Sequence, residues 1–325
     1  MRQLYKSVLL ICVGAGTSLA QNSVAEGDFQ LALPSHTGQL AWHAEGFKVI
    51  ESSAQQNGNE IGLRGKDAPG RLAFLGFLFL FSDQAPLTSA KCRDGVMEPE
   101  KKSNPGLRIL ANSEIARPDG QQIALVRYTS EDRNKKTTYM TRGFVAAGDL
   151  CGDLEFYGDA PNDKELQKIF ASFRLDPQYA PQFQDLLLYA QVLYGHRMYK
   201  AAAPIFEQAL SRLKDDDAPQ TRTMRRVTTD QAGMAYGMSG DVAKARTIFV
   251  AAIAKDPDYP LYYYNLACAD AEQKNLKDAE QHLQQAFARK ANVISGEKIP
   301  DPTKDDSFLQ HRDNKEFWKF VETLR

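Results

Sequence analysis

The chain has 325 residues, 25% of them charged, and a formal net charge of −1 at pH 7. This balance excludes the strongly basic surface that attracts nucleic acid or anionic membranes. The length exceeds that of a typical single domain, so we expect two domains.

Residues 1–20 have the pattern of an export signal. Arg2 and Lys6 supply a positive start, Val8 to Ala15 form an apolar run, and Ser18-Leu19-Ala20 offers a small-x-small cleavage site. The run is too short to span a bilayer. We predict a cleaved signal peptide, with an uncleaved anchor as the alternative. The mature protein is then extracytoplasmic (periplasmic or secreted) and peripheral to a membrane at most.

Two cysteines, Cys92 and Cys151, lie in the first half of the chain. An oxidising compartment favours a disulfide between them. In the chain-entropy model, closing a loop of this size stabilises the fold by about 4 kcal/mol. Two separate buried thiols are the alternative. The sequence has no C-x-x-C or Cys/His cluster, so we expect no metal site.

Residues 21–175 read as strands separated by turns, with two helical segments, Thr88 to about Met97 and Asp163–Phe173. We predict an α+β domain in which helices cover an antiparallel sheet. The apolar run Leu72–Phe81 is bounded by Arg71 and Asp83, and we interpret it as a central strand. The other segments with strand patterns are Phe29–Leu33, Phe47–Ser52, Glu60–Leu63, Leu107–Ala111, Gln122–Thr129 and Thr138–Ala147.

The end of this half, FVAAGDLCGDLEFYGDAPNDKELQKIFASFRL, resembles the last strand and closing helix of PsbP-like domains of exported proteins. The resemblance implies an accessory or binding module rather than a catalyst.

A repeat governs the second half. Small residues recur at Ala190, Gly233 and Ala267, and the second and third of these lie 34 residues apart. Alanine follows twelve positions later in each block, and a large apolar residue follows sixteen positions later. The later positions are Ala202, Ala245 and Ala279, then Phe206, Phe249 and Leu283, then Ala209, Ala252 and Ala286.

This register resembles the tetratricopeptide repeat (TPR) family. The resemblance implies an all-α domain of helix pairs at residues 180–290, with repeats at about 183–216, 226–259 and 260–293. Arg197 replaces the usual glycine, and Pro204 falls inside a second helix, where we expect a kink. At residues 300–325 we predict a capping helix segment, in which Asp313 and Glu316 resemble a capping box.

In this family the first helices line a concave groove that binds extended peptides or partner helices. Asn265 matches a position that often bonds a ligand backbone, although it could instead tie one repeat to the next. Carried over by alignment, the predicted partner contacts are Leu187, Gln191, Tyr194, Asp230, Gln231, Met234, Leu261, Tyr264 and Asn265.

No nucleophile, phosphate-binding or metal-binding constellation occurs in the sequence. We therefore predict neither an enzyme nor a cofactor. The leading hypothesis is an exported scaffold or adaptor that binds a protein or peptide through the repeats, and not nucleic acid. The alternative is a small-ligand or lipid-binding accessory protein that uses its N-terminal sheet domain.

Overall fold

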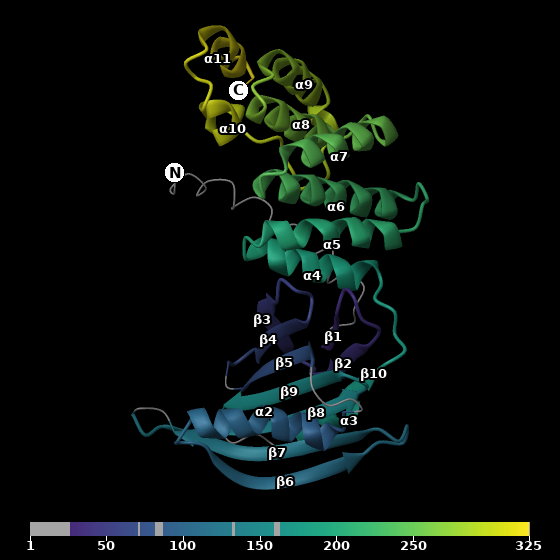
Figure 1. Cartoon of the computed structure of the whole chain (residues 1–325), viewed down its shortest axis with the longest axis vertical. Helices are drawn as coiled ribbons and strands as arrows, with labels where there is room; N and C mark the ends of the chain where they lie inside the picture. Colours follow the sequence, from purple (N-terminus) through teal and green to yellow (C-terminus); the bar gives the residue numbers. More distant parts are fainter. Residues whose placement is uncertain (1–26, 71, 82–86, 132–133, 159–162, 325) are drawn as a thin grey trace. The chain divides into compact units, whose positions relative to one another are not determined.

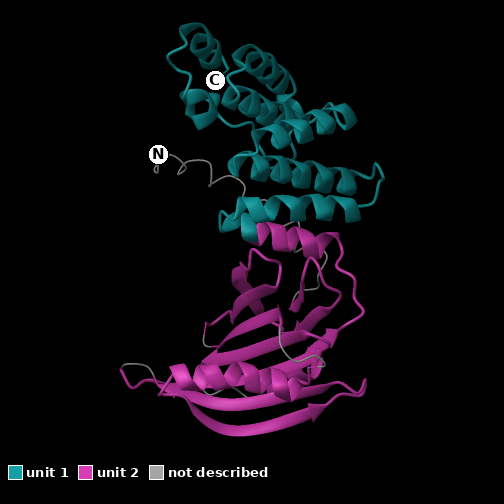
Figure 2. Ribbon diagram, viewed as in Figure 1, with its two compact units in different colours: residues 1–22, 193–325 teal, residues 23–192 magenta. Residues whose placement is uncertain are grey.

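The computed structural model describes residues 27–70, 72–81, 87–131, 134–158 and 163–324. The predicted export signal at residues 1–20 lies outside these ranges. The chain divides into two compact units, residues 23–192 and residues 193–325, with the division inside α4 (Phe183–Gly195) (Figure 2). Among the described residues, no helix is both long enough and apolar enough to cross a membrane.

The first unit is built on a seven-stranded antiparallel sheet with the order β3-β4-β5-β9-β8-β7-β6. A three-stranded sheet, β1-β2-β10, completes it. The helix α2 (Ser89–Ser103) packs on β7 and β8, and α3 (Asp163–Ser172) packs on β2 (Figure 1). The predicted α+β fold is thus confirmed. The strands are β1 (Asp28–Ala32), β2 (Gln39–His43), β3 (Phe47–Ala54), β4 (Glu60–Asp67), β5 (Leu72–Leu80), β6 (Arg108–Ala116), β7 (Gln122–Glu131), β8 (Thr137–Ala147), β9 (Leu150–Gly158) and β10 (Arg174–Asp176).

The apolar run forms β5, which pairs with β4 and β9 inside the large sheet. Phe74 of this strand is fully buried, and its ring centroid lies 5.5 Å from that of Trp42 on β2. Gly76 is required at its position because a Cβ there would overlap the Trp42 indole. Aromatic packing therefore joins the two sheets in one core.

The second unit consists of helices in which each packs on the next along the chain, from α5 to α9 (Figure 1). The predicted helical-repeat half is confirmed as an all-α region. Its elements are α5 (Tyr199–Arg212), α6 (Pro219–Met238), α7 (Val242–Lys255), α8 (Pro260–Glu272), α9 (Leu276–Ala288), η1 (Lys290–Asn292), η2 (Pro302–Lys304), α10 (Asp306–Leu309) and α11 (Lys315–Glu322).

The small residues of the repeat lie where paired helices approach closely. A Cβ on Gly233 would overlap the ring of Phe249 in the second helix of the same pair. Ala267 and Ala279 are fully buried at the equivalent contact of the next pair. Close helix–helix packing therefore requires the residue sizes that define the sequence register.

The turns inside the three predicted repeats share one backbone conformation. Gly240 has a φ of 96°, and Arg197 and Lys274 at the matching positions have φ of 62° and 63°. For a residue with a Cβ this left-handed conformation costs roughly 1–2 kcal/mol. Glycine is usual here for that physical reason, and two of the three turns carry the strain instead.

The helix α5 runs from Tyr199 to Arg212 with Pro204 inside it, and Phe206 on its buried face is fully enclosed. Two local expectations need correction. The second repeat was expected to start near residue 226, but its first helix, α6, begins at Pro219. The cap of α11 is Asn314, whose side chain accepts from the Phe317 N–H at 3.1 Å, and not Asp313.

Candidate partner-binding face

The first helices of the second and third repeats, α6 and α8, pack against each other. We call the surface formed by Asp230, Gln231 and Met234 of α6 and by Leu261, Tyr264, Asn265 and Cys268 of α8 the α6–α8 face. Leu261, Met234 and Asn265 are partly exposed on it, whereas Asp230 and Gln231 are buried.

Asn265 ties the two repeats together. Its Nδ2 donates to Oδ1 of Asp230 at 2.6 Å. Asp230 is 7% exposed. Burial, together with the nearby negative charge of Glu297, raises the pKa of Asp230 to about 7, while the bond from Asn265 opposes the shift. The face therefore contains a carboxyl group that titrates near neutral pH.

The partner contacts predicted for the first repeat, Leu187, Gln191 and Tyr194, lie on α4. Leu187 and Gln191 lie on the part of α4 that belongs to the sheet unit, and Leu187 is buried. Tyr194 belongs to the repeat unit, where its hydroxyl lies 3.5 Å from the sulfur of Met238 and 4.0 Å from that of Met234. Tyr194 is thereby linked to α6.

The C-terminal cap, which we define as residues 302–324, covers part of α8. The Tyr264 hydroxyl donates to Asp305 at 3.0 Å, and the Tyr264 ring packs edge-on against Phe308 with centroids 5.8 Å apart. Tyr264 is only 1% exposed as a result. The Cys268 thiol, 3.8 Å from the same carboxylate, is free of disulfide, and burial and the charge of Asp305 raise its pKa. Tyr264 and Cys268 therefore both contact the C-terminal cap.

The sheet unit carries a buried charge cluster that the sequence did not indicate. Arg142 on β8 makes a two-pronged ion pair with Asp153 on β9, at 2.8 Å and 2.6 Å, and also contacts Glu100 of α2 at 2.5 Å. Next to it, the Tyr128 hydroxyl donates to Glu155. Burial raises the pKa of Glu155 against the opposing charge of Arg142. This cluster fixes α2 to the sheet beside a disulfide.

That disulfide joins Cys92 of α2 to Cys151 of β9, whose Cα atoms are 6.0 Å apart. Both residues are fully buried, in a core cluster that also contains Phe144 and Tyr128.

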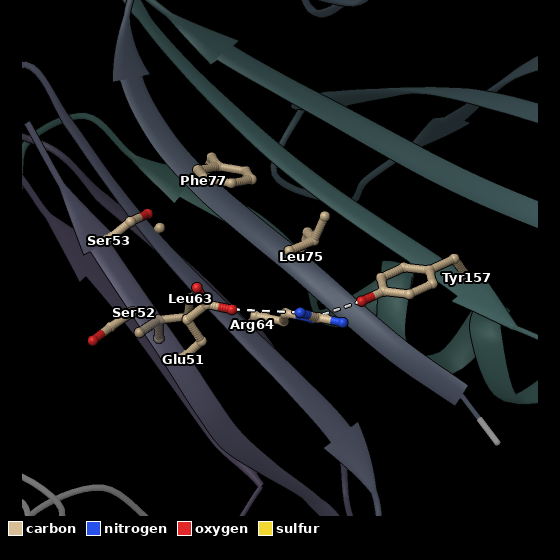
Figure 3. A pocket seen from close by; sticks show the side chains of 9 residues that line it. Glu51, Ser52, Ser53, Leu63, Arg64, Leu75, Phe77 and Tyr157 are labelled. Atoms are coloured by element: carbon tan, nitrogen blue, oxygen red, sulfur yellow. Dashed lines mark hydrogen bonds and ion pairs between the residues drawn. The ribbon is translucent and has the colours of Figure 1, made fainter. Parts of the chain in front are cut away.

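A small hollow opens on the large sheet, over β3, β4, β5 and β9 (Figure 3). Leu75 and Phe77 form its apolar part, and Arg64 lies across it, bonded to the Tyr157 hydroxyl at 2.8 Å and to Glu51 at 3.4 Å. Its volume of about 220 Å³ is below the roughly 300–1,000 Å³ usual for small-molecule sites.

Within the described part of the chain, no group of three or more His, Cys, Asp or Glu side chains is arranged to hold a metal ion. His282 and Arg246 make polar contacts that hold neighbouring helices together. Both residues bond the buried Asp270, at 2.7 Å and 2.8 Å, and so link α9 and α7 to α8.

Comparison with known proteins identifies one sequence match. Residues 238–294, which include α7, α8 and α9, match the tetratricopeptide repeat family. No curated protein matches the chain. The TPR domain of Sgt2 from Aspergillus fumigatus is 19% identical, with a TM-score of 0.31 over 45% of this chain and 78% of that one. A Bacteroides thetaiotaomicron protein is 9% identical, with a TM-score of 0.30 over 64% of this chain and 78% of its own.

Proposed function

We propose that this protein is a scaffold whose repeat unit binds a segment of another protein on the α6–α8 face. The observation that carries the proposal is the TPR match at residues 238–294, together with the packing of two successive first helices. TPR repeats generally bind protein partners through such helices. Met234 and Leu261 offer partly exposed apolar contacts there, and a flexible methionine tolerates varied side chains.

In this proposal Asn265 does not contact the partner directly. Its amide is engaged by Asp230, so it holds the two repeats in register beneath the partner. Tyr264 is likewise engaged by the C-terminal cap. The direct contacts are then Met234 and Leu261, with Tyr194 at the margin.

Export of the mature chain is part of the proposal. It is supported by the signal-like pattern of residues 1–20 and by the Cys92–Cys151 disulfide, which persists best in an oxidising compartment. The PsbP-like resemblance of residues 144–175 stays a prediction. The hollow on the sheet supports no separate ligand-binding function, because its volume is small for such a site.

Site-specific photo-crosslinking tests the partner-binding role. A photoreactive amino acid replaces Met234 in the full-length chain, expressed in its native host. A matched chain carries it at Val250, an apolar position of α7 that is 45% exposed. We expect a discrete crosslinked protein from position 234 alone, and its loss after Leu261→Glu. Identical crosslinks from both positions, or none from position 234, would refute the proposal.

A further inference from the structure

Residues 293–301, which we call the strap, run alongside α8 between η1 and η2 and contain neither helix nor strand. Ile294 packs against the cluster that contains Tyr259 and Tyr262, a cluster that Met234 and Leu261 also contact. Ile299 packs against the next cluster along α8, which contains Tyr264 and Ala267. The strap therefore lies against α8 beside the α6–α8 face, and the charge of its Glu297 helps to raise the pKa of Asp230 on that face.

One side-chain hydrogen bond joins the strap to Tyr259, the residue that precedes α8. Oε2 of Glu297 accepts from the Tyr259 hydroxyl at 2.9 Å and from the Ile294 N–H at 3.3 Å. The guanidinium of Arg226 lies 5.0 Å from the centre of the Tyr259 ring. Burial raises the pKa of Glu297, and the hydrogen bonds from Tyr259 and the Ile294 N–H, with the charge of Arg226, oppose that shift. The site thus offers a hydroxyl donor for a carboxyl group, next to an apolar surface for an aliphatic side chain.

The strap is less firmly packed than the C-terminal cap that follows it. None of its residues is buried, and Ile294, Glu297 and Ile299 are only partly covered. By contrast, Phe308 and Val321 of the C-terminal cap are fully buried. On the other side, Asn292 is anchored by its bond to the Asp258 carbonyl at 3.2 Å. The strap can therefore leave α8 while both of its ends stay in place.

We propose that the strap is an internal substitute for the partner and that it reveals the partner's chemistry. On this reading, which rests on the proposed function, the partner segment forms a β-turn with an aliphatic residue three positions before a carboxylate. Ile294 and Glu297 are placed in this way in the strap, where the Glu297 N–H donates to the Ile294 carbonyl at 2.9 Å. A tethered strap acts at an effective concentration on the order of millimolar. A partner binds only where it displaces the strap from Tyr259 and the apolar cluster.

Peptide binding to the full-length chain tests this inference. The probe is a fluorescein-labelled peptide of the strap sequence, VISGEKIPD, followed by fluorescence anisotropy. The chains compared are wild type, a loosened variant (Ile294→Ser with Glu297→Ala), and a matched control, Lys298→Ala, at an exposed strap position. We expect the loosened variant to bind the peptide at least tenfold more tightly than the other two chains. A peptide carrying Glu297→Lys should not bind. Equal binding to all three chains, or no binding to the loosened variant, overturns the proposal.

Hydrogen exchange in the unaltered chain gives a second test that requires no variant to fold. The strap amides should exchange at least tenfold faster than those of α11, and a strap as protected as α11 overturns the proposal. Rapid labelling of the Cys268 thiol would show that the C-terminal cap of the loosened variant is unfolded. In that case hydrogen exchange in the unaltered chain alone tests the proposal. A crosslinked partner at position 234 combined with failure of both tests refutes the strap inference and leaves the proposed function standing.

Discussion

Asp230→Asn perturbs the one carboxyl group of the α6–α8 face whose pKa lies near neutral pH. Burial raises that pKa from an ordinary value of 3.8 to about 7. The folded state thus holds the proton more tightly than the unfolded state does. The associated stability is fully present below the unfolded pKa and is lost as the pH rises to about 7.

The magnitude follows from this shift. Each pKa unit corresponds to about 1.4 kcal/mol, so the total loss is about 4 kcal/mol, of which about 3 kcal/mol falls between about pH 5 and pH 8. The asparagine has nearly the same shape, can accept the Asn265 hydrogen bond through its Oδ1, and cannot ionise.

Urea unfolding followed by far-ultraviolet circular dichroism, which reports chiefly the helices, measures the effect. We expect the stability advantage of Asp230→Asn over wild type to grow by about 3 kcal/mol between about pH 5 and pH 8. Asp313→Asn, at an exposed position, is the matched control and should follow wild type. Parallel pH dependence of wild type and Asp230→Asn would show that the carboxyl group is not desolvated in the way the packing implies.

Three other substitutions test features of the two units by urea or thermal unfolding. Arg142→Met leaves the buried carboxylate of its partner without a counter-charge and should lower the free energy of unfolding by about 3–5 kcal/mol; a loss below about 1 kcal/mol, typical of an exposed pair, would contradict the buried ion pair. Lys274→Gly relieves a left-handed turn and should stabilise the repeat unit by about 1 kcal/mol, whereas Lys277→Gly, inside α9, should destabilise it by about 1 kcal/mol. Replacing Cys92 and Cys151 by serine opens a link across 59 residues and should cost about 4 kcal/mol; an unchanged midpoint in the sheet unit would count against the disulfide.

The repeat half could be predicted because its signal is local and periodic. Gly233 and Phe249 contact each other across one helix pair, and their spacing recurs in the next pair. The long strand β5 was equally readable, since a short apolar run bounded by charged residues is typical of a strand. Phe74 and Leu78 on one face of β5 are buried, whereas Leu75 and Phe77 on the other face are only partly covered. Local residue types carry these signals, and tertiary contacts did not have to be known.

The parts that sequence analysis missed depend on pairing between distant residues. The strand β10 has three residues, too few for a pattern, and forms through its pairing with β2. Arg142 is separated from Glu100 by 42 positions, and neither has a distinctive neighbour. The strap contains neither helix nor strand. Its position on α8 follows from Tyr259 and Glu297, which lie 38 positions apart.

The polar groups of the α6–α8 face are already satisfied within the chain, and this limits how a partner can bind. Asn265 and Asp230 bond each other, so separating them would leave the buried Asp230 carboxyl without this partner, at about 1–3 kcal/mol. Replacing the strap carries no such cost, because a partner carboxylate can accept the Tyr259 bond that Glu297 releases. A partner that replaces Glu297 as the acceptor for the Tyr259 hydroxyl therefore binds at a lower free-energy cost than one that separates Asn265 from Asp230. A partner that supplies only apolar contacts leaves this hydroxyl unpaired and should bind roughly tenfold more weakly than one carrying a carboxylate, a difference of about 1.4 kcal/mol.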